Sequence, residues 1–201
     1  VNNIFVTIVP KFKKDNSVVK RSNYVSTSLK NEILYTLSDY KLINSEITFI
    51  DPVYLATDLL LKAANELNRV DFKDVTELRI VRNSATIAND DTIKNKVSTI
   101  ITNYFNKAKL GQLIDIKQLN TDIISIEGID SFYTYRTDIQ LKSNGLSLGI
   151  YNPIHSGNDL RVVDTNHELK YFQIPYIEDP VLFKNKIKVE TITKSKTVIE
   201  Y

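Results

Sequence analysis

The clearest pattern of apolar and polar positions in the chain lies between Asp91 and Ala108. Its apolar residues recur at the spacing of one helix face, while lysine and asparagine take the opposite side. The apolar set comprises Ile93, Val97, Ile100, Ile101, Tyr104, Phe105 and Ala108. Asn89 or Asp90 is suited to cap the first turn, and Gly111 lies just beyond the last. Because an isolated helix of this length is marginal in water, we expect the stripe to pack on a partner surface.

Apolar residues also recur at helical spacing in two shorter segments. In the first, the hydroxyls of residues 26–28 offer N-caps, and the apolar face predicts a helix of about three turns. That face comprises Leu29, Ile33, Leu37 and Tyr40. The second helix begins at Asp115, with Gln118 at the capping-box position, and ends at Gly128. Its inner face comprises Ile116, Leu119 and Ile123.

Runs of β-branched and aromatic residues predict strands elsewhere in the chain. The predicted strands are Ile4–Val9, Ile47–Ile50, Ile129–Ile139, Lys186–Ile192 and Lys196–Tyr201. Residues 53–61 alternate as a strand requires, yet Asp51 as a cap and Pro52 in the first turn could equally open a helix. Residues 65–90 also fit either a helix or a strand, so the pattern does not decide the secondary structure of either segment.

The order of these elements predicts an α+β fold, with helices packed on a small mixed sheet and followed by a β-rich irregular extension. After Gln140, glycine and proline break the chain into short β-type runs. We therefore predict an α/β sandwich domain at residues 1–140. A β-rich C-terminal region at residues 141–201 is the expected interface with other chains.

Composition narrows the functional classes. The 201-residue chain has no cysteine, which excludes disulfides, thiolate nucleophiles and cysteine-based zinc sites. Its 26 basic and 24 acidic residues give a net charge of +2, whereas a dedicated nucleic-acid binder usually carries a clear basic excess. Because the chain has no methionine and begins with Val1, we expect it to be a fragment of a longer protein. No apolar run reaches the ~18 residues of a membrane-spanning helix.

Little in the sequence supports an enzyme. The two histidines are His155 and His167, and a triad of Ser156, His167 and Asp164 can be written down. However, no nucleophile-elbow motif surrounds the serine. The histidines lack the spacing of metal ligands, and the 5 glycines form no phosphate-binding loop. We therefore expect no catalytic residue, no cofactor and no metal.

Aromatic residues are more prominent, with 11 tyrosines and 8 phenylalanines. Several lie in the irregular C-terminal third, where aromatic side chains often anchor protein–protein contacts. The candidate interface residues are Tyr151, Tyr171, Phe172, Tyr176, Phe183 and Tyr201. For about half of them, packing in the region's own core is the expected alternative. A second group, Phe132, Tyr133 and Tyr135, falls on a predicted strand and suggests an alternative function, the binding of single-stranded RNA on a sheet.

Several segments, taken in order, resemble a known protein family. They are Ile4–Pro10 (IFVTIVP), Ile47–Leu55 (ITFIDPVYL), the predicted helix over 93–105, residues 110–126, and Ile150–Ile154 (IYNPI). Together they resemble the J-like baseplate proteins of contractile-tailed bacteriophages and are most similar to the baseplate wedge subunit of T-even-type phages. The resemblance covers nearly the whole chain and would make it the C-terminal part of such a protein.

The resemblance implies a structural role. Such subunits form a ring that ties the wedges of the baseplate together and rearranges when the baseplate triggers sheath contraction. They bind copies of themselves, as a homodimer or ring, and other wedge proteins, and they carry no catalytic or cofactor residues. The implied location is the tail baseplate of the virion, assembled in the host cytoplasm, with neither membrane nor nucleic acid as a partner. The resemblance also favours a strand for the segment after Pro52.

Overall fold

The computed structural model describes residues 2–10, 24–40, 45–61, 76–153 and 160–191. In these ranges the helices are α1 (Thr27–Ser38), α2 (Asp90–Asn106), α3 (Ile116–Ile124) and α4 (Pro180–Asn185). The strands are β1 (Asn2–Val6), β2 (Ser45–Phe49), β3 (Val53–Leu59), β4 (Thr76–Arg82), β5 (Leu113–Ile114), β6 (Ile129–Arg136), β7 (Leu141–Asn144), β8 (Leu148–Tyr151), β9 (Arg161–Val163), β10 (His167–Glu168), β11 (Gln173–Ile177) and β12 (Ile187–Thr191). The chain has an α+β fold, as the order of elements predicted.

Most of the described strands belong to two sheets built on the same plan. The β3 sheet has the order β11-β3-β8-β9, and the β4 sheet has the order β12-β4-β6-β7. In each sheet the first edge strand runs parallel to its neighbour, and the remaining pairs are antiparallel. β5 and β10 form a short antiparallel pair, and β1 and β2 form a parallel pair.

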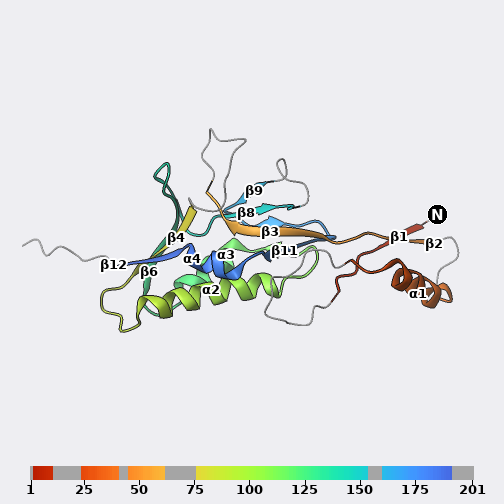
Figure 1. Ribbon diagram of the computed structural model, residues 1–201, viewed down its shortest axis with the longest axis horizontal. Helices are drawn as coiled ribbons and strands as arrows, with labels where there is room; N and C mark the ends of the chain where they lie inside the picture. The colour runs from red at the N-terminus through yellow and green to blue at the C-terminus, as the bar shows by residue number, and fades with distance from the viewer. Residues whose placement is uncertain (1, 11–23, 41–44, 62–75, 154–159, 192–201) are drawn as a thin grey trace, which may run out of the picture.

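Helices α2, α3 and α4 pack along the same side of these sheets (Figure 1). Asn89 caps α2 by accepting a hydrogen bond from the Thr92 backbone N at 2.8 Å, and Asp115 caps α3 by accepting one from the Gln118 backbone N at 2.9 Å. The structure thus confirms these two predicted helices, and α1 is the third helix that the spacing predicted. None of the helices in the described ranges combines the length and hydropathy of a membrane span.

One cluster of buried apolar residues joins both sheets and the three helices. It extends from Leu55 on β3 to Ile187 on β12 and includes Ile101 and Phe105 from α2. The predicted boundary near residue 141 falls between strands that share the same two sheets. Strands β8, β11 and β12 follow that position, yet they pair with β3 and β4, which precede it. The backbone hydrogen bonds of β8, β11 and β12 therefore go to strands of the first half of the chain.

A buried polar seam holds the two sheets together where β7 leads into β8. The Thr134 hydroxyl donates to the Gly145 carbonyl at 2.9 Å and accepts from the Ser147 backbone N at 2.9 Å. The Ser147 hydroxyl in turn donates to the Leu60 carbonyl at 2.7 Å. Gly145 has φ 87°, a conformation that glycine adopts at little cost. The seam ties β6 of one sheet to the end of β3 in the other.

Each of the two segments that the sequence pattern left undecided contains a strand in its described part. Residues 53–59 form β3 because β11 and β8 supply backbone partners on both sides. The segment 65–90 contributes β4 at residues 76–82. The predicted strand at Ile4–Val9 is assigned to Asn2–Val6, and the strand at Ile129–Ile139 ends at Arg136. The predicted strand at Lys196–Tyr201 lies outside the described residues.

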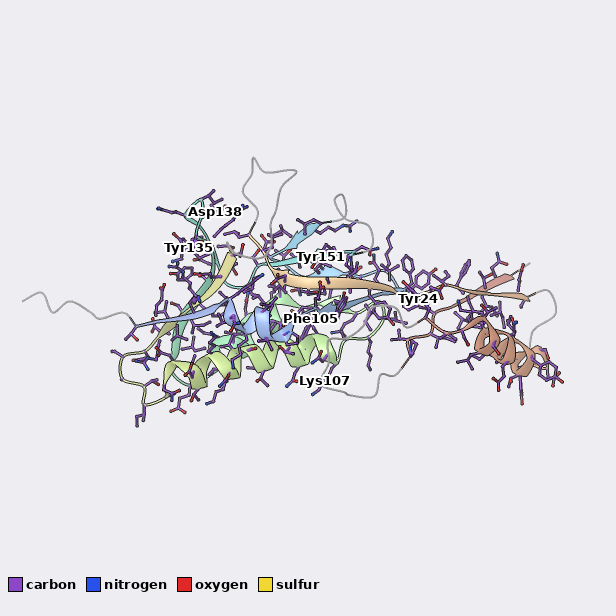
Figure 2. The ribbon with its side chains drawn as sticks, viewed as in Figure 1. Tyr24, Phe105, Lys107, Tyr135, Asp138 and Tyr151 are labelled. Carbon is purple, nitrogen blue, oxygen red and sulfur yellow. The ribbon has the colours of Figure 1, made fainter. Side chains whose placement is uncertain are left out.

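The first elements of the chain stand apart from this body. We call β1, α1 and β2 the N-terminal arm, and the elements from β3 to β12 the body. Figure 1 shows the arm at one end of the long axis, reached from the body along the extended run of β2 and β3. Tyr24 lies where the arm meets the body, whereas Tyr135 and Asp138 lie towards the opposite end (Figure 2).

Candidate interaction surfaces

The N-terminal arm is a strand–helix–strand unit with very little core of its own. α1 begins after Ser26, whose hydroxyl accepts a hydrogen bond from the Leu29 backbone N at 3.2 Å. No residue of α1 is fully buried. Its half-buried side is formed by Lys30, Ile33, Leu34 and Leu37. The apolar stripe of the predicted helix is thus only partly covered, and both Leu29 and Tyr40 are exposed rather than inward-facing.

The sheet of the arm is equally uncovered. Ile4 pairs with Ile47 and Val6 pairs with Phe49 in register, so these four side chains share one face. Phe5 projects from the opposite face and is 54% exposed. Tyr35 on α1 is 83% exposed. Parallel sheets are normally covered on both faces, and a pair of strands alone is marginally stable in water. The arm therefore presents an apolar surface that suits contact with another chain.

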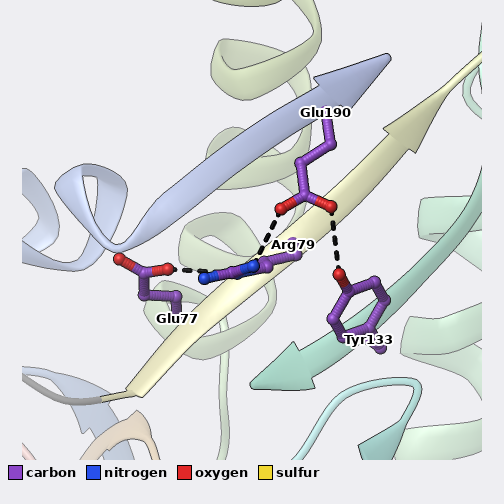
Figure 3. Close-up of polar contacts among 4 residues, drawn as sticks. All are labelled: Glu77, Arg79, Tyr133 and Glu190. Carbon is purple, nitrogen blue, oxygen red and sulfur yellow. Dashed lines mark hydrogen bonds and ion pairs between the residues drawn. The ribbon is translucent and has the colours of Figure 1, made fainter. Parts of the chain in front are cut away.

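A second surface lies on the β4 sheet, on the face turned away from the helices. Alternation along the strands places Glu77 and Arg79 of β4 on this face together with Tyr133 and Tyr135 of β6, to which they are paired in register. Arg79 contacts Glu77 through Nε at 3.2 Å and Glu190 of β12 through Nη1 at 3.0 Å (Figure 3). The Tyr133 hydroxyl donates to the other oxygen of Glu190 at 3.0 Å. Three strands are thus cross-linked by one polar network.

Electrostatics keep this network in its charged form. Partial burial lowers the pKa of Arg79, but the hydrogen bond with Tyr133 and the carboxylates of Glu190 and Glu77 outweigh it, so the pKa is raised. Burial raises the pKa of Tyr133, and its hydrogen bond to Glu190 raises it further. The phenol therefore stays protonated as a donor, and the guanidinium stays positive between two carboxylates.

Two cations stack on the tyrosines of the same face. The Arg79 guanidinium lies 4.0 Å from the centre of the Tyr135 ring, and Lys142 Nζ lies 4.0 Å from the centre of the Tyr133 ring. Phe132, the third member of the predicted aromatic group, packs against the core on the other side of the sheet. The face thus offers two of the three expected rings, and Glu77 and Glu190 add negative charge beside them.

The candidate interface aromatics of the C-terminal third are placed very differently from one another. Tyr171 is exposed and meets Phe172 edge-on, while the half-buried Tyr151 donates from its hydroxyl to Glu178 at 3.1 Å. Phe183 is 2% exposed within the body core, and Tyr176 is buried against Tyr54. Phe183 and Tyr176 therefore pack within the chain, which is the alternative expected for about half of these residues. Tyr201 lies outside the described residues.

Of the four residues weighed for catalysis and metal binding, the structure describes His167 and Asp164. His167 lies on β10, paired in register with Ile114, and Asp164 is exposed in the preceding turn. His155 and Ser156 lie outside the described residues. Among the described residues, no group of three or more histidines or carboxylates is arranged to hold a metal ion.

The arm's exposed apolar surface and the β4 network were both missed by sequence reasoning. Arg79 and Arg82 both form ion pairs within the chain, Arg79 with Glu190 at 3.0 Å and Arg82 with Asp90 at 3.1 Å. The alternation of Glu77, Arg79 and Val81 was a usable signal for the network, because it marks one face of a strand.

Comparisons of the sequence with protein-family models and with curated proteins found no match. The support for the two candidate surfaces therefore comes from the geometry of the structure. The arm offers apolar side chains without a covering layer, and the β4 sheet offers an ordered face of tyrosines and paired charges.

Proposed function

We propose that this chain is a non-catalytic structural component of a bacteriophage tail baseplate wedge, which links wedges into a ring through contacts with copies of itself and with other wedge proteins. The proposal includes rearrangement of the subunit when the sheath contracts. The sequence resemblance suggests the assembly, and one structural observation supports a role in assembly generally. That observation is the N-terminal arm, whose parallel strand pair and helix leave apolar side chains uncovered.

The arm is an incomplete unit on physical grounds. Folding orders its backbone at a cost of about 1–2 kcal/mol per residue, and burial of apolar surface has to offset that cost. In the body, α2 meets this requirement by burying Ile93, Val97, Ile101 and Phe105. In the arm, α1 buries none of its residues fully. A neighbouring chain that covers Phe5 or adds a strand beside β1 or β2 would supply the missing burial.

The arm's position suits a linking role. It lies at one end of the elongated molecule, so a partner bound there leaves the body's surfaces accessible (Figure 1). The polar face of the β4 sheet, with Tyr133, Tyr135 and Arg79, has the composition of a protein–protein contact, in which tyrosine and arginine are enriched. A subunit with separate contact surfaces can hold two neighbours at once.

Self-association is tested by sedimentation velocity over a concentration series. We expect the wild-type chain to form dimers or larger species as its concentration rises, and we expect Phe5→Ser to weaken this association about tenfold or more, because Phe5 is the large apolar side chain on the uncovered face. Ile87→Ser is the matched control, because Ile87 is fully exposed on the loop before α2 in the body. If the wild type, Phe5→Ser and Ile87→Ser all remain monomeric at every concentration, the result contradicts self-association.

The assembly itself is tested by immunogold electron microscopy of phage particles with an antibody raised against this chain. Label gathered at the base of the tail is the expected result. Label elsewhere on the particle, or none on intact and contracted tails alike, contradicts the baseplate assignment.

The alternative function, single-stranded nucleic-acid binding on the β4 sheet, has one observation in its favour. Arg79 and Lys142 stack on Tyr135 and Tyr133, which is a combination that single-strand binders use. Glu190 opposes it, because its carboxylate already engages Arg79 and would repel phosphate. A filter-binding titration at low salt separates the two functions. Tight binding that Tyr135→Ala weakens would favour this alternative over the structural role.

A further inference from the structure

Strands β11 and β12 hold equivalent places, since each is the parallel edge strand of its sheet. In such a ladder, alternate residues direct their backbone N–H and C=O groups to the neighbouring strand, and the residues between direct them away from the sheet. The Val53 backbone N donates to the Phe172 carbonyl at 2.8 Å, and the Leu78 backbone N donates to the Lys186 carbonyl at 3.0 Å. These two bonds identify the outward-facing residues, which are Gln173, Pro175 and Ile177 on β11 and Ile187, Val189 and Thr191 on β12.

The outer edge of β11 is closed. Pro175, its middle residue, has no backbone N–H to offer to another strand. The Gln173 backbone N donates to the Lys170 carbonyl at 2.8 Å, and the Gln173 carbonyl accepts from the Gly111 backbone N at 2.9 Å. Proline and covering loops are the usual means by which proteins protect an edge strand.

The outer edge of β12 lacks this protection. Its middle residue is Val189, and the strand contains no proline. In the part of the chain that the structure describes, no hydrogen bond reaches the outward-facing backbone groups of β12. Lys188 and Thr191 are exposed, and Val189 is half-buried. β12 therefore ends the β4 sheet in an edge that is able to add a strand.

The side chains of β12 suit one particular added strand, which is a second copy of β12 running antiparallel. Pairing about a two-fold axis at Val189 places Val189 opposite its own copy and Ile187 opposite Thr191, so all the outward-facing groups find partners. Lys188 of each copy then faces Glu190 of the other, in the type of pair whose side chains lie closest. Centring the pairing on Lys188 or Glu190 instead would place like charges opposite each other. The charge pattern therefore selects a single register.

The carboxylate of Glu190 is already held in place for such a contact. It accepts a hydrogen bond from the Tyr133 hydroxyl and forms an ion pair with Arg79, both at 3.0 Å, yet its side chain is 39% exposed. Alternation along the strand puts Lys188 on the same face of the sheet. A lysine alone on an edge strand opposes pairing, but here the carboxylate two residues further on supplies the complementary charge.

We propose that β12 pairs antiparallel with β12 of a second copy of this chain, in the register centred on Val189, and joins the two β4 sheets into one continuous sheet. This inference rests on the self-association proposed above and deepens it by naming a surface and a register. β12 lies towards the end of the long axis opposite the arm, so the two contacts are separate (Figure 1).

The charges are tested by sedimentation velocity in a Phe5→Ser background, in which the arm contributes little. We expect this parent protein to form dimers as its concentration rises. Adding Lys188→Glu makes glutamates face each other, and adding Glu190→Lys makes lysines face each other, so each variant alone should associate about tenfold more weakly. An equal mixture of the two should recover the association, because every facing pair in a mixed dimer again joins opposite charges.

Lys107→Glu is the matched control, because it makes the same charge change at an exposed position on the C-cap of α2, away from β12 (Figures 1 and 2). It should associate as the parent does. Equal weakening by Lys107→Glu, or a mixture no better than its components, overturns the proposal. If Phe5→Ser is monomeric while the wild type associates, the β12 pairing fails and the arm contact stands. If Phe5→Ser associates as the wild type does and the charge variants weaken it, the arm contact fails and the β12 pairing stands.

Disulfide trapping tests the register directly, because the chain has no cysteine of its own. In the proposed register, residue 188 of one copy and residue 190 of the other have Cα atoms ~4.5 Å apart, which a disulfide can span. Two copies of the same residue lie diagonally, about 7–8 Å apart, which is too far. A mixture of Lys188→Cys and Glu190→Cys should therefore give cross-linked dimers on a non-reducing gel, and either variant alone should give few. No cross-linking of the mixture, or equal cross-linking of the single variants, contradicts the register.

Discussion

In the body, α2 buries one complete side against two sheets, whereas α1 in the arm leaves every one of its residues at least partly exposed. Both helices begin with a side-chain cap, Asn89 in one case and Ser26 in the other. The difference therefore lies in what each helix packs on. α2 packs against β11, β12, α3 and α4, while the arm offers α1 only the pair β1 and β2. The same local chemistry yields a stable core in one region and an open surface in the other.

The largest expected effect comes from matched phenylalanines in the two regions. Phe105 is 2% exposed in the body core, so Phe105→Ala should lower the free energy of unfolding by about 3–5 kcal/mol. Phe5 in the arm is largely exposed, so Phe5→Ala should cost less than about 1 kcal/mol. Urea unfolding of dilute protein measures both. Similar losses for the two variants would show that the arm has a core comparable to that of the body.

A smaller effect is expected at the seam between the sheets. Thr134→Val keeps the shape of the side chain but removes the acceptor for the Ser147 backbone N, which is buried. We expect a loss of about 1–3 kcal/mol in the free energy of unfolding. The matched change in the arm is Ser26→Ala, which removes an exposed helix cap and should cost about 1 kcal/mol or less. Equal or reversed losses would contradict the distinction between the two regions.

The smallest effect concerns the pH dependence of two ion pairs. In the body, Asp58 bonds to Lys186, yet burial raises the pKa of Asp58 more than the lysine lowers it. The folded chain therefore binds this proton more tightly than the unfolded chain. The resulting stability is present below the usual aspartate pKa and is lost as the pH rises through the raised pKa.

Asp58→Asn removes this dependence. The difference between the unfolding free energies of the wild type and Asp58→Asn should therefore fall as the pH rises above the usual aspartate pKa, because burial raises the pKa of Asp58. Asp51→Asn is the control, because Asp51 pairs with Lys30 in the arm and is exposed. Urea unfolding at a series of pH values measures both differences. A difference for Asp58→Asn that rises with pH would mean that the lysine, rather than burial, controls this carboxyl.

The parts of the fold that local spacing governs were predicted well. The periodicity and caps around α2 and α3 gave the start of each helix closely, because capping and a buried stripe depend on neighbours in sequence. The end of α3 was placed too late, since the helix stops at Ile124 and not at Gly128. The helix α4 was missed, although Asp179 followed by Pro180 is the same cap-and-proline signal that was weighed at Asp51 and Pro52. At Asp51 and Pro52 the signal does not start a helix, because β11 and β8 hold the following residues in a sheet.

What sequence reasoning could not supply was the pairing of distant segments. The irregular texture after Gln140 predicted a separate region, but β8, β11 and β12 complete sheets begun by β3 and β4. The same limitation affected the aromatic residues. Phe183 and Tyr171 lie in similar sequence surroundings, and only the packing of α4 on α2 buries the first and leaves the second exposed.

The placement of β11 and β12 has a consequence for synthesis on the ribosome. Each is the parallel edge strand of its sheet, and each is made long after the strand that it pairs with. While the chain is being made, β3 and β4 therefore emerge with one edge unpaired, and closing them requires contacts between residues far apart in sequence, which form slowly. A ribosome that stalls before residue 173 would hold two open sheet edges, which are natural targets for chaperones and for aggregation with sister chains.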